Sequence, residues 1–178
     1  AYLGVSSPCT TAAEVMIEDP DPEALYAAQR YFPVADLSLL ADRAGDALPA
    51  ILDTARKCAQ SGQGGNPLLC DCEMVSLAEV EEVAKAPDTY SLTDIRLRTR
   101  LGMGTCQGTF CSLRAINAMY EHELPQAKNP LNAIQRFLEE RFRGIRPTFW
   151  GTQAQEMELN HAIYAGVLNL DSYTHASE

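Results

Sequence analysis

Four cysteines lie in two close pairs, and this grouping limits what the chain can fold into more than any other feature of the sequence. The first pair is Cys70 and Cys72, separated by one residue, and the second is Cys106 and Cys111, separated by four. Close thiolates on loops are a common way to bind a soft metal centre, and four of them give tetrahedral thiolate ligation. The fold must therefore bring two distant loops together around zinc or an iron–sulfur cluster.

The spacing within the pairs favours a binuclear cluster over zinc. Zinc ribbons normally use C-x₂-C pairs, whereas this chain has C-x-C and C-x₄-C. A binuclear cluster presents two irons and accommodates one pair of thiolates at each. A structural zinc or interaction module, in which the thiolates only join helices together, stays open as the alternative. Colour separates the two, because zinc proteins are colourless.

The composition excludes several other classes of protein. Hydrophobic residues make up 46% of the chain and charged residues 21%, which is typical of a globular protein. The net charge of −10 argues against binding to nucleic acid or an anionic membrane. No apolar run reaches the roughly 18 residues that cross a bilayer, so direct membrane insertion is not expected. The chain begins at Ala1 rather than Met, which suggests a piece of a longer protein.

The cysteine usage predicts reduced thiols in an intracellular protein. A chain of 178 residues can bury a core without disulfides. Cys70 and Cys72 are also too close in the sequence to pair easily with each other. Cys9 and Cys58 stand alone, and we interpret them as small buried hydrophobic residues.

Hydrophobic periodicity predicts a mainly α-helical fold. Two capping boxes are expected, at Ser76 with Glu79 and at Ser91 with Asp94, and Asn129 is expected to cap a helix that starts at Pro130. The expected helices cover residues 23–31, 34–44, 48–55, 77–85, 92–99, 110–120, 130–143 and 153–164. Other segments predict irregular structure: an extended connection over 8–23, a flexible linker over 62–65 and an extended aromatic strap over 145–151.

The residues around the cysteines suit a cluster. Both pairs lie close to predicted helix starts, where free N–H groups and partial positive charge lower thiol pKa values and hydrogen-bond sulfur. Glycines at 102, 104 and 108 let the backbone approach closely, and the first two are expected to end the preceding helix. Four arginines, at 96, 98, 100 and 114, would favour the reduced form of a negatively charged cluster. The alternative is that these arginines are an ordinary solvated helix face.

No catalytic residue is predicted. His122, His161 and His175 have no nucleophile motif beside them and are interpreted as surface or capping residues. The carboxylates of Glu79, Glu81 and Glu82 are interpreted as a solvated helix face. Phe149 and Trp150 are interpreted as a hydrophobic anchor. A stand-alone hydrolase or transferase therefore has little support.

Several of these motifs together resemble a known family. Residues 70–73 (CDCE), 91–96 (SLTDIR), 98–108 (RTRLGMGTCQG) and 110–111 (FC) look like the bacterioferritin-associated-ferredoxin-like (BFD-like) [2Fe–2S] domain. More narrowly, they resemble its version at the C-terminus of the large subunit of anaerobic glycerol-3-phosphate dehydrogenases. Residues 3–12, 141–147 and 150–151 are similar to the stretches that flank the cluster domain in that family. General BFD-like members have C-x₂-C as the second pair, whereas C-x₄-C fits the dehydrogenase version.

The resemblance implies a set of functional expectations. Cys70, Cys72, Cys106 and Cys111 would ligate a [2Fe–2S] cluster in a small helical domain that contains a helix-loop-helix module and a C-terminal extension of helices and strap. Residues 1–65 would hold the end of a flavoprotein body, a linker and a helical hairpin, residues 66–121 the cluster-binding domain, and residues 122–178 the C-terminal helices with the strap.

The large subunit in that family oxidises glycerol 3-phosphate to dihydroxyacetone phosphate on FAD. Electrons then pass through partner redox subunits to membrane quinone. The resemblance therefore implies that this chain packs on the flavin-binding body, in the cytoplasm at the inner face of the membrane. The chain lacks a G-x-G-x-x-G flavin fingerprint, so we expect it neither to bind FAD nor to turn over substrate alone. Its function would be electron transfer.

Overall fold

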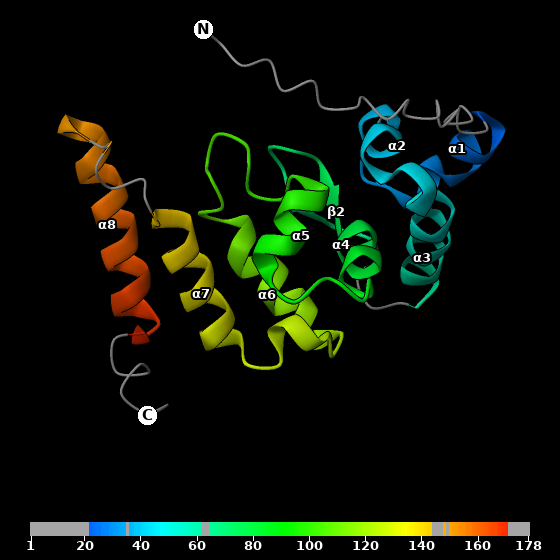
Figure 1. Cartoon of the computed structure of the whole chain (residues 1–178). Helices are drawn as coiled ribbons and strands as arrows, with labels where there is room; N and C mark the ends of the chain where they lie inside the picture. The colour runs from blue at the N-terminus through cyan, green and yellow to red at the C-terminus, as the bar shows by residue number, and fades with distance from the viewer. Residues whose placement is uncertain (1–21, 35, 62–64, 144–147, 149, 171–178) are drawn as a thin grey trace, which may run out of the picture.

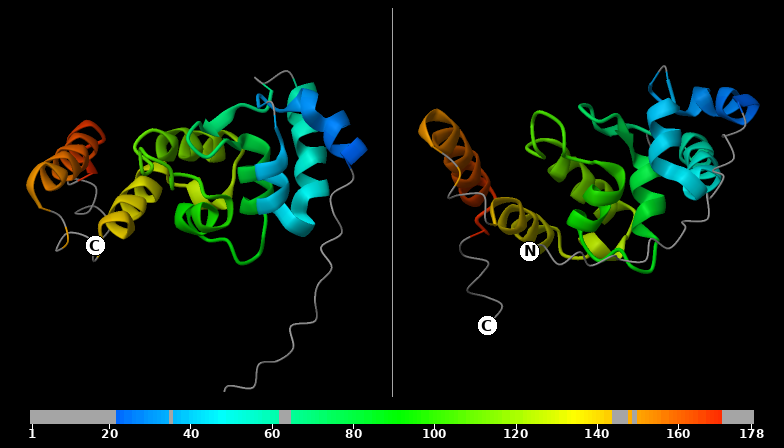
Figure 2. Two further views of the ribbon diagram at one scale, coloured as in Figure 1. Left: turned by 90° about the horizontal axis from the view of Figure 1, so that it is seen from above. Right: turned by 45° about the horizontal axis from the view of Figure 1, so that its top comes forward.

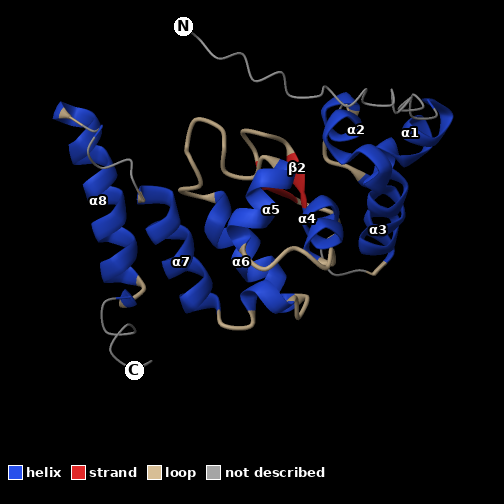
Figure 3. Cartoon of the chain, viewed as in Figure 1, coloured by secondary structure: helices blue, strands red, loops and turns tan. Residues whose placement is uncertain are grey.

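The computed structural model describes residues 22–34, 36–61, 65–143, 148 and 150–170. Residues 8–21 of the expected extended connection, the core of the 62–65 linker, most of the aromatic strap, Cys9 and His175 lie outside these residues. The last two residues of that connection, 22 and 23, are not extended but begin a helix. Within them the chain is mainly helical, with one short β-hairpin (Figure 3). The prediction of a mainly α fold is therefore confirmed.

The elements fall into three groups that follow one another across the molecule (Figure 1). The first group contains α1 (Pro22–Ala28), the 3₁₀ helix η1 (Gln29–Tyr31), α2 (Ser38–Ala44), η2 (Gly45–Ala47) and α3 (Leu48–Gln60). The central group contains β1 (Leu68–Cys70), β2 (Val75–Ser76), α4 (Leu77–Ala84), α5 (Leu92–Thr99) and α6 (Cys111–Glu121). The last group contains η3 (Pro125–Ala127), α7 (Pro130–Phe142) and α8 (Gly151–Val167). Figure 2 shows α1–α3 and α7–α8 at opposite ends in two further views.

Two hydrophobic clusters form the core. The smaller cluster lies among α1, α2 and α3, where Ile51 and Ala55 are almost fully buried, and Ala78 of α4 joins it. The larger cluster runs from Cys58 to Leu170 and joins the central group to α7 and α8. Helix α4 therefore stands between the two clusters, with α3 packed against it.

The β-hairpin was not predicted from the sequence. Strands β1 and β2 are antiparallel, with Leu68 opposite Ser76 and Cys70 opposite Val75. The chain turns back over residues 71–74, and Met74 adopts a left-handed backbone conformation at φ 51°. The apolar run 67–69 is too short to show a strand period, which explains why only an irregular approach to the first cysteine pair was expected.

The predicted helix caps differ in outcome. The capping box of Ser91 and Asp94 is present in full, and Asn129 accepts a hydrogen bond from the Asn132 N–H, so both of these predictions are confirmed. The box predicted at Ser76 and Glu79 is wrong in its serine half, because the Ser76 hydroxyl makes no capping bond. Asn66 instead accepts the Ala78 N–H at 2.9 Å, and this satisfies the first turn of α4 from outside the helix.

The end of α5 also differs from the expectation. Gly102 and Gly104 were expected to end this helix, but Arg100 does so in a left-handed conformation at φ 64°. The Thr99 hydroxyl bonds the Ile95 carbonyl and accepts the Leu101 N–H at 3.1 Å, which fixes the turn out of the helix. Gly102, at φ 73°, belongs to the next turn.

Candidate metal centre: two cysteine loops

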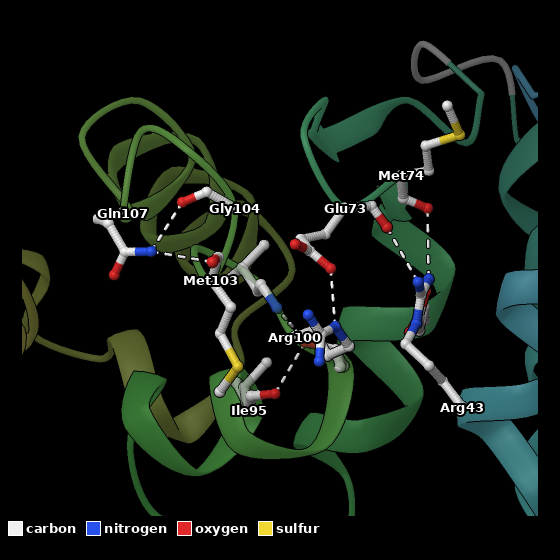
Figure 4. Close-up of polar contacts among 11 residues, drawn as sticks. Arg43, Glu73, Met74, Ile95, Arg100, Met103, Gly104 and Gln107 are labelled. Carbon is white, nitrogen blue, oxygen red and sulfur yellow. Dashed lines mark hydrogen bonds and ion pairs between the residues drawn. The ribbon is translucent and has the colours of Figure 1, made fainter.

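Cys70 and Cys72 lie at the turn of the β-hairpin. Cys70 ends β1 and is 1% exposed, whereas Cys72 is exposed. Arginines from three helices fix the residues around them. Arg114 of α6 pairs with Asp71 at 2.5 Å, and Arg100, at the end of α5, pairs with Glu73 at 2.8 Å. Arg43 of α2 donates to the Glu73 carbonyl at 2.9 Å (Figure 4).

Cys106 and Cys111 belong to a glycine-rich loop that leads into α6. Hydrogen bonds within the loop define its shape: the Gln107 side chain donates to the Met103 and Gly104 carbonyls at 2.9 and 2.8 Å (Figure 4). The Thr109 hydroxyl donates to the Cys106 carbonyl at 2.7 Å. Cys111 is the first residue of α6, one residue after the expected helix start, and is buried, whereas Cys106 is partly exposed.

The structure brings the four predicted cysteines together as two cross-pairs. The sulfurs of Cys72 and Cys106 are 4.0 Å apart, and the Cys111 thiol lies close enough to the Cys70 thiol for that group to raise its pKa. Two thiolates on one tetrahedral metal with bonds of about 2.3 Å lie about 3.8 Å apart. Each spatial pair therefore takes one cysteine from each loop, whereas the sequence suggested one sequence pair at each iron. In the described part of the chain, no group of three or more His, Cys, Asp or Glu side chains is arranged to ligate a single metal ion.

Glycines make this approach possible. A Cβ added at Gly104 would lie 2.3 Å from the Cys72 Cβ and 3.4 Å from its sulfur. A Cβ at Gly102 would lie 3.5 Å from the Cys111 sulfur and 3.1 Å from the Gly108 Cα. The two loops can therefore meet around the sulfurs only where these side chains are absent.

The electrostatic environment differs between the two cross-pairs. A hydrogen bond from the Thr105 hydroxyl, with further bonds from the N–H and thiol of Cys106, lowers the pKa of the Cys72 thiol. Burial, followed by the nearby thiols of Cys70 and Cys106, raises the pKa of Cys111. Cys72 therefore forms a thiolate more readily than Cys111 does. Cys70 and Cys111 form the buried side of the site.

The arginines predicted to surround the site divide into two kinds. Three of them are paired with carboxylates, since Arg98 bonds Asp88 at 2.6 Å and Arg100 and Arg114 bond the first loop. The Nε of Arg96 is buried without a hydrogen-bond partner, as is the hydroxyl of Ser112. Both residues line a small pocket together with Gly102, Gly108 and Cys111. These two unpartnered hydrogen-bond donors beside a cysteine could donate to an electron-rich group such as a cluster sulfide.

The interpretation of Glu79, Glu81 and Glu82 as a solvated face is wrong. Glu79 is 2% exposed and pairs with Arg43 at 2.9 Å. Glu81 and Glu82 are each only 17% exposed at the side chain and contact Lys85. The cause is the first helical group, because α3 covers the face of α4 that carries these residues.

Sequence reasoning also missed several neighbours of the site. Arg43 approaches from α2, and Arg141 donates to the Gln107 carbonyl at 3.4 Å. Tyr164 of α8 lines a cleft with Cys106 and His161. Burial, then proximity to Cys106 and Cys111, raises its pKa. All of these are long-range contacts, for which a single sequence gives no signal.

The residues present fit a [2Fe–2S] cluster. The four thiols from the two loops could ligate its irons, and the glycines leave room beside the sulfurs. Hydrogen-bond donors lie beside Cys72 and beside Cys111.

Comparison with known proteins shows what this chain is similar to. The anaerobic glycerol-3-phosphate dehydrogenase of Escherichia coli has a large subunit, designated A, that is 32% identical to this chain over 170 residues, covering 95% of this chain and 30% of the relative. The corresponding subunit of Haemophilus influenzae is 38% identical over 58% of this chain, which is 18% of the relative. That of Haloferax volcanii, designated A1, is 30% identical over 95% of this chain and 27% of the relative.

The chain is homologous to part of this large subunit. It spans under a third of the length of these curated relatives. No protein-family model matches it, and no solved structure matches it significantly. Among the described residues no helix is long and apolar enough to span a bilayer.

Proposed function

We propose that this chain is the [2Fe–2S]-carrying part of the large subunit of an anaerobic glycerol-3-phosphate dehydrogenase and that it transfers electrons. The observation that carries the proposal is that the two loops bring the four cysteines together, with the Cys72 and Cys106 sulfurs 4.0 Å apart and the Cys70 thiol near enough to raise the pKa of Cys111. Homology to the large subunit over 95% of the chain supports the same assignment.

In this proposal the four cysteines, two from each loop, would hold the cluster. A bound [2Fe–2S] cluster gains and loses single electrons. The chain's own residues supply the surroundings: the N–H of Cys106 and the Thr105 hydroxyl donate to the Cys72 sulfur, and hydrogen bonds of this kind tune the potential. The burial of Cys70 and Cys111 at 1% and 2% exposure leaves the Cys72 and Cys106 end nearest to the surface. Electrons would therefore enter or leave at that end.

The whole protein is proposed to be an FAD-dependent enzyme that oxidises glycerol 3-phosphate to dihydroxyacetone phosphate. The partners of this chain would be the flavin-binding body and the redox subunits that lead to quinone, in the cytoplasm at the inner face of the membrane. Residues 66–121 would form the cluster domain, residues 1–65 its connection to the flavoprotein body, and residues 122–178 the C-terminal extension. The name of the Escherichia coli relative, and the fact that this chain covers 30% of its length, support a role as one part of such a protein.

The decisive experiment is a visible spectrum of anaerobically purified protein, with iron, sulfide and zinc counted on the same sample. We expect broad bands above about 400 nm and equal iron and sulfide, because thiolate-ligated clusters are coloured. Cys72→Ser should abolish the bands. Cys58→Ser is the matched control, since Cys58 is buried but bonds Glu81 rather than the site cysteines.

The alternative of a structural zinc module predicts a different result in the same samples. Colourless protein with one zinc per chain, and no uptake of iron and sulfide on anaerobic reconstitution, would overturn the cluster. Loss of the bands in Cys58→Ser but not in Cys72→Ser would overturn the assignment of the ligands.

A further inference from the structure

We propose that Arg43 is a positioning residue, which ties the first helical group to the Cys70–Cys72 loop and sets the distance between Cys72 and Cys106. The inference rests on the proposed function, because it concerns the same two loops. It adds a role for helices that lie outside the cysteine motifs, since Arg43 comes from α2.

The contacts of Arg43 join three parts of the molecule. One edge of its guanidinium bonds both carboxylate oxygens of Glu79 on α4, at 3.0 and 2.9 Å. The remaining donors reach the backbone carbonyls of Glu73 at 2.9 Å and Met74 at 3.4 Å (Figure 4). The side chains of Arg43 and Glu79 are only 10% and 3% exposed, so the pair is shielded from water.

The loop has a physical need for these donors. Met74 has φ 51°, a left-handed conformation that is unfavourable for a residue with a side chain and persists only where the surroundings fix it. The turn also directs two consecutive carbonyls, of Glu73 and Met74, toward α2 rather than across the hairpin. Arg43 satisfies both with charge-assisted bonds, which are stronger than neutral ones. The bonded carbonyls begin one residue after Cys72, so movement there is transmitted to its sulfur.

The geometry requires arginine rather than a positive charge alone. Arginine has five donors in a planar fork, which allows one edge to face a carboxylate while other donors reach a turn. A lysine at this position would offer a single point charge and could not span Glu79 and both carbonyls together. Arg100, by contrast, reaches only the side chain of Glu73, from the exposed side of the loop.

The test uses variants that separate the loop contact from the buried charge. Removal of Arg43 alone would leave the Glu79 carboxylate buried without its partner, which destabilises the fold. Arg43→Met is therefore combined with Glu79→Gln. The single variant Glu79→Gln retains the hydrogen bonds from Arg43 to the loop carbonyls. The variant Arg43→Lys retains the positive charge but lacks the planar set of donors of a guanidinium. Arg56→Met is the matched control, because Arg56 pairs with Asp53 on the exposed surface of α3, away from the cysteine loops.

Two measurements are made on the full chain. The first is the rate at which an iron chelator bleaches the reconstituted cluster, and the second is amide hydrogen exchange at residues 72–75 in the metal-free protein. We expect bleaching about tenfold faster in the double variant, the size typical when a residue supporting a metal ligand is lost. Exchange at 72–75 should also rise while urea unfolding shows the fold intact. Arg43→Lys should resemble the double variant, and Glu79→Gln and Arg56→Met should resemble the unsubstituted chain.

The outcomes distinguish this inference from the proposed function. If the unsubstituted chain binds no iron and sulfide, the cluster assignment fails, and the exchange rates alone decide whether Arg43 fixes the loop. If the unsubstituted chain loads and the double variant bleaches and exchanges at the same rate, the positioning role is overturned while the cluster stands. Equal acceleration in Glu79→Gln would also overturn it, because the loop carbonyls keep their donor in that variant.

Discussion

The two cysteine loops meet at one site, but they owe their shapes to different interactions. The loop of Cys106 is shaped by its own residues, through bonds from Gln107 and Thr109 that reach three or four residues along the chain. The loop of Cys72 is fixed by arginines from separate helices, 27 to 43 residues away in the sequence. One loop is therefore locally encoded, and the other depends on the assembled fold.

This difference has a consequence for stability. A locally bonded loop packed on the core resists deformation, because a change of shape breaks several bonds and contacts together. Two of the three arginines that bond the first loop, Arg100 and Arg114, are exposed, and exposed ion pairs contribute little to stability. We therefore expect substitutions in the second loop to cost more free energy of unfolding than substitutions of the surface arginines around the first.

The largest effect is expected at Gly108 of the second loop. Its φ of 92° is unfavourable for any other residue, and an added Cβ would lie 2.6 Å from the Phe137 ring. Backbone strain and overpacking together should lower the free energy of unfolding by about 3 kcal/mol in Gly108→Ala. Urea unfolding of the metal-free protein measures this directly.

A second glycine isolates the packing contribution. Gly65 also has a positive φ, 75°, but among the described residues, its chain neighbours aside, no atom lies within 4 Å of the position that a Cβ would take there. Gly65→Ala should therefore show only the backbone cost, about 1 kcal/mol. Equal losses in the two variants would mean that the second loop is not packed tightly against α7, and the contrast between the loops would fail.

The same contrast explains how much could be predicted from the sequence. The helices and the caps at Ser91 and Asn129 were predictable, because periodicity and capping depend on residues a few positions apart. The second loop was predictable to the extent that its glycines indicated a close approach. The end of α5 at Arg100 was not predictable, because no sequence pattern indicates that an arginine will adopt a left-handed backbone conformation.

The first loop shows what could not be predicted. The cross-pairing of Cys72 with Cys106 depends on how the β-hairpin sits on α5 and α6, and the hairpin itself is too short to recognise. The buried pair of Arg43 and Glu79 arises because α2 and α3 cover α4. Only three-dimensional packing distinguishes Glu79 from the solvated glutamates that the sequence suggested.

A smaller effect is expected from the capping box before the second loop. The Asp94 carboxylate accepts bonds from the N–H groups of Tyr90 and Ser91, both at 2.9 Å. Asp94→Ala should cost about 1 kcal/mol. Asp94→Asn retains an acceptor oxygen and should cost less. Loss of more than about 2 kcal/mol in Asp94→Ala, measured by urea unfolding, would mean that α5 transmits the damage to the cysteine loop.

The same residue predicts a pH dependence with a definite sign. Partial burial raises the pKa of Asp94, but hydrogen bonds from Tyr90 and Ser91 outweigh it, so the pKa in the folded protein lies below the usual value of 3.8. A lowered carboxyl pKa adds stability that is complete above the unfolded value and is lost as the pH falls through the folded value. The difference in stability between the unsubstituted chain and Asp94→Asn should therefore shrink from about pH 6 toward about pH 3. A constant difference across that window would show that the charge of Asp94 contributes nothing.

The smallest effect is expected at Arg114 of α6, which pairs with Asp71 of the first loop. Its ion pair with Asp71 is exposed, with side chains 50% and 67% accessible, so Arg114→Met should change the free energy of unfolding by less than about 1 kcal/mol. Added salt should reduce the difference further, because exposed charges are screened. Arg98→Met is the matched control, since Arg98 forms a similar exposed pair with Asp88 away from the cysteines. Both should cost little, but of the two only Arg114→Met should speed amide exchange at residues 71 and 72, because Arg114 bonds the cysteine turn and Arg98 bonds Asp88 instead. A large, salt-independent loss in Arg114→Met would show that the first loop is held as firmly as the second.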